Sequence, residues 1–447
     1  MAVWPYLNKL DPSASEGFLS VTVAVYAFTQ TFSAPLLGYW ANRCGRIKPP
    51  LIFAFGCLIV SNLLWMSLES IHVSGIKWVL LLSRCLAGTG HGAVGTLRGY
   101  VASASTPDGR GKAIGTAAVF FSIGLASGPI IQIAFSPLGY PGIQNDWFHF
   151  NIYTGPPLVL LVTNVAALVL LMKCFKETYV DVATTDDSKS SYGVVPSYDK
   201  LVIVVCCFTW FCVAICVAHV ESVNTPYTMM IYGWTNEEAV VYNNIMAACQ
   251  GTIDLAVFAL FAIKLERILD YRHSIIAGLV VLLLSYIISF PWPMWPADIP
   301  LLSSSNLTSP DVNGCDAHMH AWCETSPRVN VWVYSFCFVA MLSVGFDMTT
   351  VCIITLYSKA IGPRRQGTLQ GILWQAGCIA KTIGPLTMLH LLMAVGPQML
   401  WLLLIGTYIC SIIPWVIHYK RLIPLVVKAE LKSGECVKYD QGIMYRF

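Results

Sequence analysis

The stretch Pro107–Pro129, PDGRGKAIGTAAVFFSIGLASGP, decides the fold because its spacing returns later in the chain. Pro363–Pro385, PRRQGTLQGILWQAGCIAKTIGP, repeats its proline and glycine positions at one offset of 256 residues. The matching pairs are Pro107/Pro363, Gly111/Gly367, Gly115/Gly371, Gly128/Gly384 and Pro129/Pro385. Prolines start or break helices, and glycines let backbones approach closely. The shared spacing therefore predicts a duplicated helical unit and two structurally equivalent halves, a common trait of transporters.

The composition predicts an integral membrane protein. Of the 447 residues, 56% are hydrophobic and only 11% are charged, against about 25% charged in soluble domains. A hydrocarbon core about 30 Å thick needs roughly 20 apolar residues per helix. We expect eleven complete membrane-spanning helices, at Gly17–Ala41, Leu51–Leu68, Trp78–Val101, Ala113–Phe135, Pro157–Met172, Leu201–Val223, Ala239–Ile263, Ser274–Trp292, Val329–Tyr357, Thr368–Val395 and Met399–His418.

The basic residues predict which helix ends face the cytosol. Of the 27 Lys and Arg residues, 21 fall in one set of links or in the C-terminal tail. Only Lys9, Lys77 and Arg328 fall in the other set. Cytosolic loops of membrane proteins carry the excess of positive charge. The first set, which includes the link around Arg43 and Arg46, is therefore expected to be cytosolic.

This orientation predicts how the chain is divided. It places Asn8–Glu16 on the far side, so Met1–Leu7 is expected to be the outer end of a helix whose start is missing. A twelfth span would give two six-helix bundles related by the repeat. The alternative is a genuine eleven-span protein with an external N-terminus. The expected domains are an N-terminal bundle over residues 1–180 with an incomplete first helix, a cytosolic linker over 181–200, a C-terminal bundle over 201–418 and a cytosolic tail over 419–447.

The expected far-side loop Pro293–Arg328 carries signs of a lumenal or extracellular environment. The sequon Asn-Leu-Thr at Asn306 is the expected glycosylation site. Cys315 and Cys323 lie in the same loop, and an oxidising compartment favours a disulfide between them. With the two histidines between them, the same cysteines would also suit a metal site. We favour the disulfide, because oxidised cysteines do not ligate metals as thiolates.

The first expected cytosolic link, Gly38–Lys48, has the sequence GYWANRCGRIK. It resembles the signature loop of the major facilitator superfamily, G-x-x-x-D-R-x-G-R-[KR], with Asn42 in place of the usual Asp and Ile47 in place of a basic residue. Glycines permit a tight turn between packed helices, and basic side chains can cap helix carbonyls. Asn42 weakens the charge lock that an Asp would supply. The resemblance makes these the candidate gating residues: Gly38, Asn42, Arg43, Gly45 and Arg46.

Two more stretches resemble motifs of the same superfamily. Arg84–Gly90, RCLAGTG, is similar to its R-x-x-x-G-x-G helix, and Gly124–Pro129, GLASGP, is similar to its G-x-x-x-G-P helix. Scattered further stretches, among them Trp4–Leu7 and Tyr419–Ile423, resemble a lysosomal branch of the superfamily. The resemblance implies an all-α major facilitator fold and an endo-lysosomal multispanning transporter that moves anions such as chloride.

The third expected helix carries a polar stripe. Arg84, Gly88, His91, Gly95 and Arg98 recur at spacings that place them on one helix face. Charge facing lipid is costly, so this face should point to the protein interior, where it would attract an anion. Arg84 offers a planar fork for a carboxylate or phosphate. The alternatives are that Arg84 pairs with an acid or with helix-end carbonyls, that Arg98 reaches to the cytosolic surface, and that His91 is a packed polar residue rather than a proton relay.

Four further ionisable residues lie within the expected spans: Glu221, Asp254, Asp347 and Lys381. Glu221 or Asp254 is expected to carry a proton, because a carboxylate buried in a membrane readily takes one up. Lys381 would neutralise one of these acids. The alternative is a structural salt bridge, which we favour for Asp254 and Lys381, whereas for Glu221 we favour a function. The sequence gives no preference for Asp347.

The motifs favour transport over catalysis. No Walker loop, dinucleotide fingerprint or metal-protease motif occurs, so we expect neither an enzyme nor a cofactor or metal. The expected partners are the lipid bilayer and a small solute or ion, with no nucleic acid. The first hypothesis is a secondary transporter of a small anionic solute, working by alternating access in a lysosomal or endosomal membrane. A chloride-type anion channel on the same fold and a non-transporting membrane scaffold are the alternatives.

Overall fold

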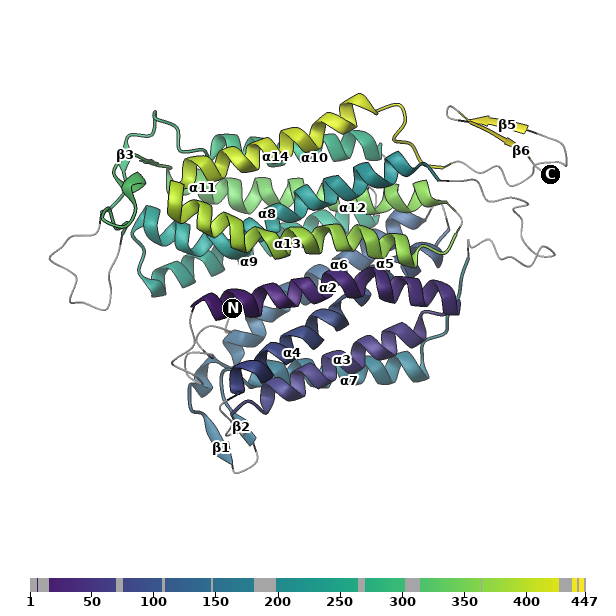
Figure 1. Ribbon diagram of the computed structural model, residues 1–447, viewed down its shortest axis with the longest axis horizontal. Helices are drawn as coiled ribbons and strands as arrows, with labels where there is room; N and C mark the ends of the chain where they lie inside the picture. The colour runs from purple at the N-terminus through teal and green to yellow at the C-terminus, as the bar shows by residue number, and fades with distance from the viewer. Residues whose placement is uncertain are drawn as a thin grey trace.

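The computed structural model of the chain describes residues 6, 16–69, 75–106, 109–145, 148–180, 198–263, 270–301, 314–362, 364–425, 436–439 and 442–445. Long helices dominate it, and Figure 1 shows them running side by side in two bundles. The all-α expectation is confirmed. Several expectations lie outside the described residues: the glycosylation site Asn306, the prolines that begin the two repeats, and most of the linker and of the N-terminal segment.

The N-terminal bundle forms the lower part of Figure 1. Prolines at the first positions of α3 and α7 fit there because the first N–H groups of a helix need no partner inside it. A short antiparallel hairpin, β1 (Ile143–Asn145) with β2 (Phe148–Phe150), joins α6 to α7. The helices are α2 (Glu16–Cys44), α3 (Lys48–Met66), α4 (Ile76–His91), α5 (Ala93–Ser103), α6 (Arg110–Ala134) and α7 (Gly155–Lys173).

The C-terminal bundle forms the upper part of Figure 1. The side chains of Asp199, Asp270 and Asn330 accept backbone N–H groups at the starts of α8, α10 and α11, as helix caps do. A π-helical segment, Cys337–Met341, joins α11 to α12 in one continuous rod. The helices are α8 (Lys200–Tyr232), α9 (Asn236–Ile263), α10 (Tyr271–Ile288), α11 (Val331–Phe336), α12 (Leu342–Ile361), α13 (Gly367–Val395) and α14 (Pro397–Ile417).

Four short strands complete the described structure. The first pair is antiparallel, and its two strands flank the loop that holds Cys315. The second pair lies in the C-terminal tail. The strands are β3 (Ala297–Asp298), β4 (Pro327–Arg328), β5 (Cys436–Tyr439) and β6 (Gly442–Tyr445).

Within the described residues, nine helices are long and apolar enough to cross a membrane. The expected count of eleven is therefore not confirmed. The expected span Trp78–Val101 is divided at Gly92 into α4 and α5, and each piece is shorter than the roughly 20 residues that a bilayer requires. Helix α2 has the length, but polar residues such as Gln30 and Thr31 interrupt its apolar sequence.

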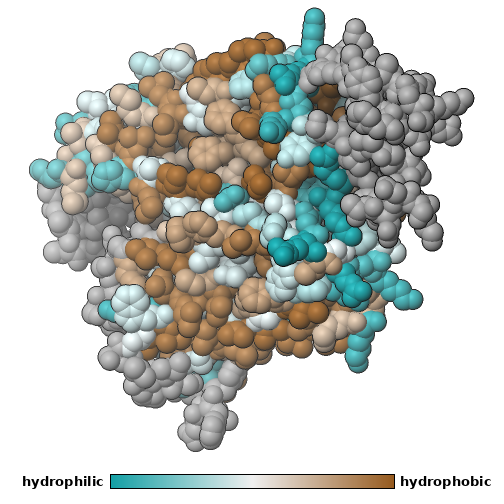
Figure 2. Space-filling view, turned by 45° about the vertical axis from the view of Figure 1, so that its right-hand side comes forward, coloured by the Kyte–Doolittle hydropathy of each residue, from teal (hydrophilic) through white to brown (hydrophobic). Residues whose placement is uncertain are grey.

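The two bundles differ in how well their helices are covered. The main core lies in the C-terminal bundle, where Trp401 and Trp415 are fully buried. In the N-terminal bundle, α6 exposes large apolar side chains such as Phe120 and Leu125, which are 70% and 68% exposed. Figure 2 shows apolar side chains, in brown, over much of the face that it presents. Outward apolar side chains of this kind suit contact with lipid.

The repeat shows the same difference in packing. Gly384 lies in α13 and packs against Ala218 of α8, whereas its counterpart Gly128 in α6 faces open space. Among the described residues of the N-terminal bundle, no helix packs on α6 as α8 packs on α13. At this pair of positions, the two copies of the repeat therefore differ in packing among the described residues.

The bundles meet where α2 and α5 pack on α13, and where α6 packs on α9. Glycines make the closest approach. A Cβ on Gly38 or Gly99 would clash with Gly367, and a Cβ on Gly95 would clash with Gly371. Gly367 and Gly371 belong to the repeat. In the C-terminal copy of the repeat, the repeated glycine spacing therefore allows the two bundles to pack closely against each other.

The two ends of the bundles carry different side chains. Arg43, Lys173 and Lys359 lie in the last turns of α2, α7 and α12, and we call this end of the molecule the basic end. The loop with Cys315 and Cys323 lies at the opposite end, which we call the disulfide end. Figure 2 shows hydrophilic side chains gathered on the right, at the basic end.

Candidate substrate pathway

The candidate gating residues lie at the basic end, where α2 meets α13. Asn42 bridges the two bundles: its Oδ1 accepts a hydrogen bond from the Gly367 N–H at 3.1 Å, and its Nδ2 donates to Thr368 Oγ1 at 2.8 Å. Gly367 is the first residue of α13, and the first N–H groups of a helix have no partner inside it. The neutral amide of Asn42 therefore caps α13 and ties the bundles together without a charge.

The other gating residues shape the turn after α2. Gly45 has a φ of 68°, in the left-handed region that favours glycine, and the Arg365 guanidinium lies against it. Arg43 Nη1 donates to the Tyr39 hydroxyl at 3.2 Å. Arg46 is exposed. The turn thus brings Arg365, from the C-terminal bundle, against the N-terminal bundle.

The sequence interpretation missed the acid of this turn. Glu177 follows α7, and its carboxylate accepts the backbone N–H groups of Ile47 and Lys48 at 3.1 and 2.9 Å. Tyr179 also donates to it at 3.2 Å, and burial together with the nearby Glu177 charge raises the pKa of Tyr179 to about 12. The carboxylate therefore caps the start of α3, where negative charge is favourable. The sequence signal that could have identified Glu177 is its position just beyond the expected span Pro157–Met172.

Arg84 lies on α4 and faces α2. Its guanidinium carbon is 4.7 Å from the centroid of the Tyr26 ring, and its buried Nε has no hydrogen-bond partner among the described residues. Gly88, one turn on, packs against the Tyr26 backbone and Thr29. The ring of His91 lies 5.5 Å from the Tyr26 ring. Arg84, Gly88 and His91 therefore share one face, with a tyrosine rather than an acid beside the arginine.

The polar stripe passes from one neighbouring helix to another along α4 and α5. Before Gly92, His91 is exposed and its Nδ1 lies 2.9 Å from the Ala87 carbonyl oxygen, within its own helix. After it, Gly95 packs against α13 instead of α2. The stripe is thus shared between a surface within the N-terminal bundle and the contact between the bundles.

Arg98 lies in that contact. Its guanidinium carbon is 4.4 Å from the Trp374 ring centroid and 5.4 Å from that of Trp210. This placement does not fit the alternative in which Arg98 reaches the surface at the basic end. The reason is the close glycine packing of α5 on α13, at Gly95 and Gly99, which encloses the neighbouring Arg98.

Glu221 of α8 and Lys381 of α13 form an ion pair. The Lys381 Nζ lies 3.5 Å from Glu221 Oε1, and the side chains are 34% and 59% exposed. The charges therefore neutralise each other on the surface of membrane-length helices. A pair exposed to this degree contributes little to stability, about 0–1 kcal/mol, which leaves room for a functional role.

Asp254 of α9 lies beside Asp347 of α12. Asp347 is 1% exposed. Asp254 Oδ1 and both carboxylate oxygens of Asp347 are buried, with no hydrogen-bond partner in the part of the chain that the structure describes. Two acidic side chains from different helices therefore meet in an apolar part of the C-terminal bundle. The sequence identified Asp254, but gave no reason to place Asp347 against it.

Asn243, on the same helix as Asp254, belongs to a closed polar network that joins α9 to α8 and α11. Asn224 Nδ2 donates to Asn243 Oδ1, and Asn243 Nδ2 donates to Thr228 Oγ1, both at 3.0 Å. The Tyr334 hydroxyl donates to Asn224 Oδ1 at 2.6 Å. These buried amides satisfy one another, so Asn243 is structural.

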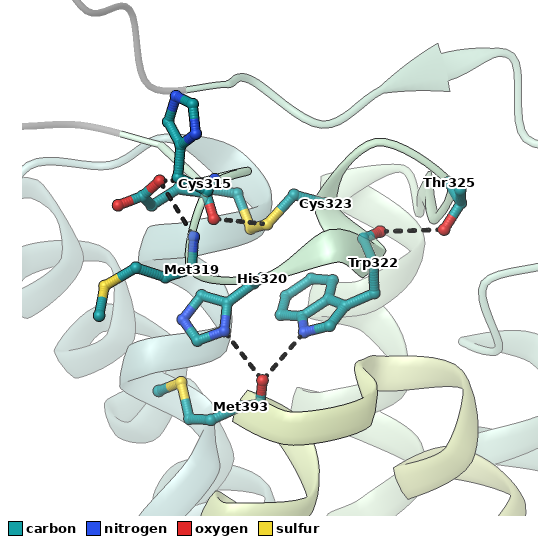
Figure 3. Close-up of a disulfide and its surroundings, with 9 residues drawn as sticks. Cys315, Met319, His320, Trp322, Cys323, Thr325 and Met393 are labelled. Atoms are coloured by element: carbon teal, nitrogen blue, oxygen red, sulfur yellow. Dashed lines mark hydrogen bonds between the residues drawn. A yellow bond between two sulfur atoms is a disulfide. The ribbon is translucent and has the colours of Figure 1, made fainter.

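The loop at the disulfide end contains the disulfide Cys315–Cys323 (Figure 3). His320 Nδ1 lies 2.9 Å from the Met393 carbonyl oxygen, and Trp322 Nε1 donates to the same oxygen at 3.3 Å. His320 is thus used to fix the loop on the end of α13. No cluster of three His, Cys, Asp or Glu side chains suited to a metal ion occurs within the described ranges.

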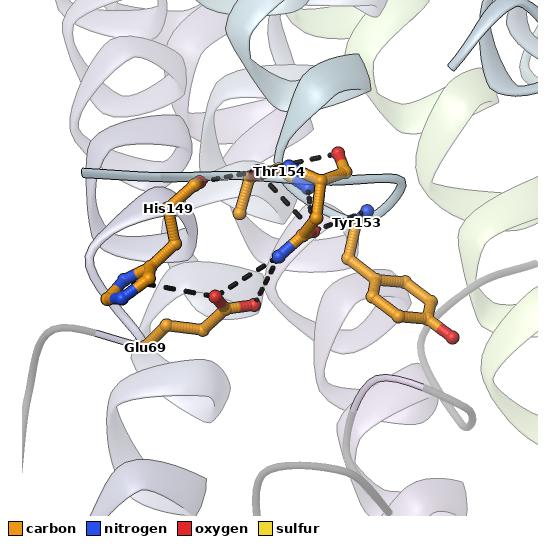
Figure 4. A network of polar contacts seen from close by, with 5 residues as sticks. Glu69, His149, Tyr153 and Thr154 are labelled. Atoms are coloured by element: carbon orange, nitrogen blue, oxygen red, sulfur yellow. Dashed lines mark hydrogen bonds and ion pairs between the residues drawn. The ribbon is translucent and has the colours of Figure 1, made fainter. Parts of the chain in front are cut away.

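A second polar network at this end surrounds Glu69 (Figure 4). The Asn151 amide donates to both carboxylate oxygens, at 2.9 and 3.1 Å, and His149 Nδ1 lies 3.9 Å from one of them. Asn151 Oδ1 in turn accepts the backbone N–H groups of Tyr153 and Thr154. The network joins the end of α3 to the start of α7.

The arrangement has relatives among known proteins. A model of the Major Facilitator Superfamily matches residues 1–385. The chain belongs to the major facilitator superfamily. It is 29% identical to major facilitator superfamily domain-containing protein 8 of Xenopus laevis, over 96% of this chain and 89% of that protein. It is 22% identical to tetracycline resistance protein, class E, of Escherichia coli, over 96% and 92% of the two chains. The Xenopus protein represents the branch that the scattered motifs indicated.

Solved structures of the superfamily share the fold. The human organic anion transporter MFSD10 matches with a TM-score of 0.59 at 15% identity, over 92% of this chain and 88% of that chain. FucP in its outward conformation matches with a TM-score of 0.64 at 14% identity, over 93% and 95%. At such identities the likeness establishes the fold alone. The expected major facilitator fold is confirmed, and the chain is a membrane secondary transporter rather than an enzyme.

Proposed function

We propose that this transporter moves a small anionic solute by alternating access. The observation that carries the proposal is the surroundings of Arg84. Its guanidinium is stacked on Tyr26 within a membrane bundle, and no carboxylate pairs with it in the described part of the chain. An intramembrane charge is costly unless it has a partner or a function. An anionic solute is the partner that the guanidinium fork fits. MFSD10, which shares the fold, is an organic anion transporter.

The contacts between the bundles support a pathway that opens away from the basic end. Asn42 and the glycine contacts hold α2 and α5 against α13 at the basic end. Glu221, farther along α8, is 59% exposed beside Lys381. Rocking of the bundles would separate the Asn42 contacts and expose the solute on the other side. In this scheme Arg84 and His91 bind the solute, and the acids Glu221 and Asp254 carry the coupled ion.

The sidedness and location are part of the same proposal. The basic end is cytosolic, because Lys and Arg gather there, and the disulfide end is lumenal, because an oxidising compartment favours disulfides. Residues 1–180 and 201–418 are then the rocking bundles, joined by the linker 181–200. The resemblance to the lysosomal branch supports a lysosomal or endosomal membrane. Loss of glycosidase-sensitive mass in Asn306→Gln tests the lumenal placement.

Uptake of radioactive chloride and acetate into proteoliposomes tests the role of Arg84. Arg84→Ala is expected to abolish uptake, whereas the control Lys176→Ala, at an exposed position after α7, should leave it unchanged. Arg84→Lys distinguishes the solutes, because a halide needs only the charge and a carboxylate uses the planar fork. Full uptake by Arg84→Ala would contradict the proposal. Uptake that proceeds as a conductance without counter-solute would favour the channel alternative.

A further inference from the structure

Arg98 is enclosed by aromatic rings from the opposite bundle. The guanidinium comes from α5 of the N-terminal bundle, and Trp210 and Trp374 come from α8 and α13 of the C-terminal bundle. The two tryptophan rings lie 6.1 Å apart at an interplanar angle of 32°. Trp210 is 5% exposed. The three side chains therefore form one compact group that exists only while the bundles are together at this level.

The polar atoms of this group that lack a hydrogen-bond partner are all donors. Arg98 Nη1, Trp210 Nε1 and Trp374 Nε1 are all buried, and none has a hydrogen-bond partner within the described residues. Guanidinium and indole N–H groups can donate but cannot accept. A buried donor without an acceptor is costly, and native proteins contain few of them. An acceptor with negative charge would satisfy these donors and also neutralise the charge of Arg98.

The acids of the neighbourhood do not supply it. Glu221 pairs with Lys381, and Asp254 lies beside Asp347 on α9 and α12. Gly377, almost one turn beyond Trp374, lies directly against Trp210 Nε1. A Cβ at this position would collide with the indole, so the glycine lets the α13 backbone approach Trp210 closely and bring the two tryptophans together.

We propose that Arg98, Trp210 and Trp374 form a second anion site between the bundles, which holds a halide or the carboxylate end of a larger solute. For its place in the transport cycle the site rests on the proposed anion transport. It differs from the Arg84 region, which lies 14 residues earlier along the broken α4–α5 helix and within the N-terminal bundle. Because its donors come from both bundles, a bound anion stabilises the state that is closed at the basic end.

Thermal unfolding of the purified full chain in lipid nanodiscs tests the site without any transport step. Chloride and acetate are titrated at constant ionic strength against a bulky sulfonate. We expect saturable stabilisation of the wild type by at least one of the two anions. Chloride alone would identify a halide site, and acetate alone would identify a carboxylate site. Stabilisation equal to that by the sulfonate, or none, would overturn the proposal.

Trp374→Phe and Trp210→Phe keep an aromatic ring against Arg98 and remove only the N–H. Each is expected to weaken the anion dependence about tenfold, the typical effect of losing one hydrogen bond to a charged group. In the sulfonate reference their stability should be unchanged or higher, because an unpaired buried donor has been removed. The matched control is Trp332→Phe, at a tryptophan that is 80% exposed. Unchanged anion dependence in both variants would show that the tryptophans only pack.

Arg84→Ala separates this site from the proposed function. It should keep the anion-dependent stabilisation while uptake is lost. If uptake survives Arg84→Ala but the stabilisation still depends on Trp374, the Arg84 role is wrong and the second site stands. If the stabilisation disappears in Arg84→Ala and persists in Trp374→Phe, the anion binds at Arg84 and the second site is wrong.

Discussion

Asn42→Ala should loosen the contact between the bundles by a predictable amount. The substitution removes the acceptor of the Gly367 N–H and the donor to Thr368 Oγ1. Each neutral hydrogen bond contributes about 1 kcal/mol net, so the loss is roughly 2 kcal/mol. At 1.4 kcal/mol per factor of ten, the ratio of closed to open basic ends should fall about 30-fold. The protein itself should remain folded, because the rest of the α2–α13 contact is unchanged.

Hydrogen exchange at the start of α13 measures this opening directly, because the Gly367 amide is itself one of the donors. We expect exchange of the peptide around Gly367 and Thr368 to quicken about 30-fold in Asn42→Ala. Asn42→Asp should slow it, because a carboxylate accepts the same N–H and its charge favours the helix N-terminus by about 0.3–1 kcal/mol. Identical exchange in wild type and Asn42→Ala would refute the bridging role of Asn42.

Three further predictions concern charged groups. Lys381→Ala should lower the free energy of unfolding by less than about 1 kcal/mol, because its pair with Glu221 is exposed; a larger loss in chemical denaturation would contradict this. Asp347→Asn should raise the thermal midpoint, because it removes one of two carboxylates that lie side by side in an apolar environment; a lower midpoint would show that the Asp254–Asp347 contact stabilises the fold. Hydrogen bonds from Arg272 hold the pKa of Asp270 below its usual value. The pair therefore stabilises the fold at any pH above the pKa that Asp270 has in the unfolded chain. This stabilisation is lost as the pH falls through the lower pKa that Asp270 has in the folded protein. Denaturation of Arg272→Ala should therefore show a deficit at neutral pH that vanishes in strong acid.

Much of the fold was predictable because hydropathy and the 256-residue repeat act at the level of whole helices. The division of the third expected span at Gly92 was not predictable, because an apolar run with glycines has the same composition whether or not its helix is continuous. The unequal packing of Gly128 and Gly384 was also hidden. Both depend on which helix lies beside the glycine, and neighbours in space are set by tertiary packing rather than by local sequence.

The candidate site was predicted in part. Spacing alone placed Arg84, Gly88 and His91 on one face, because a straight helix fixes that geometry. Spacing did not find the tryptophans around Arg98, which come from the other bundle. It also could not pair Asp254 with Asp347, since that contact depends on how α9 and α12 are rotated. Contacts between side chains of different helices can be identified only from the packed structure.

The central claim is that a small anion is carried by alternating access, and counterflow tests it most directly. Proteoliposomes containing the full chain are loaded with unlabelled chloride or acetate, and uptake of the same radioactive anion is followed with and without the internal load. The account predicts that the internal anion accelerates uptake in wild type and that Arg84→Ala abolishes both uptake and acceleration. Uptake that is indifferent to the internal anion, or that is unchanged in Arg84→Ala, would contradict it.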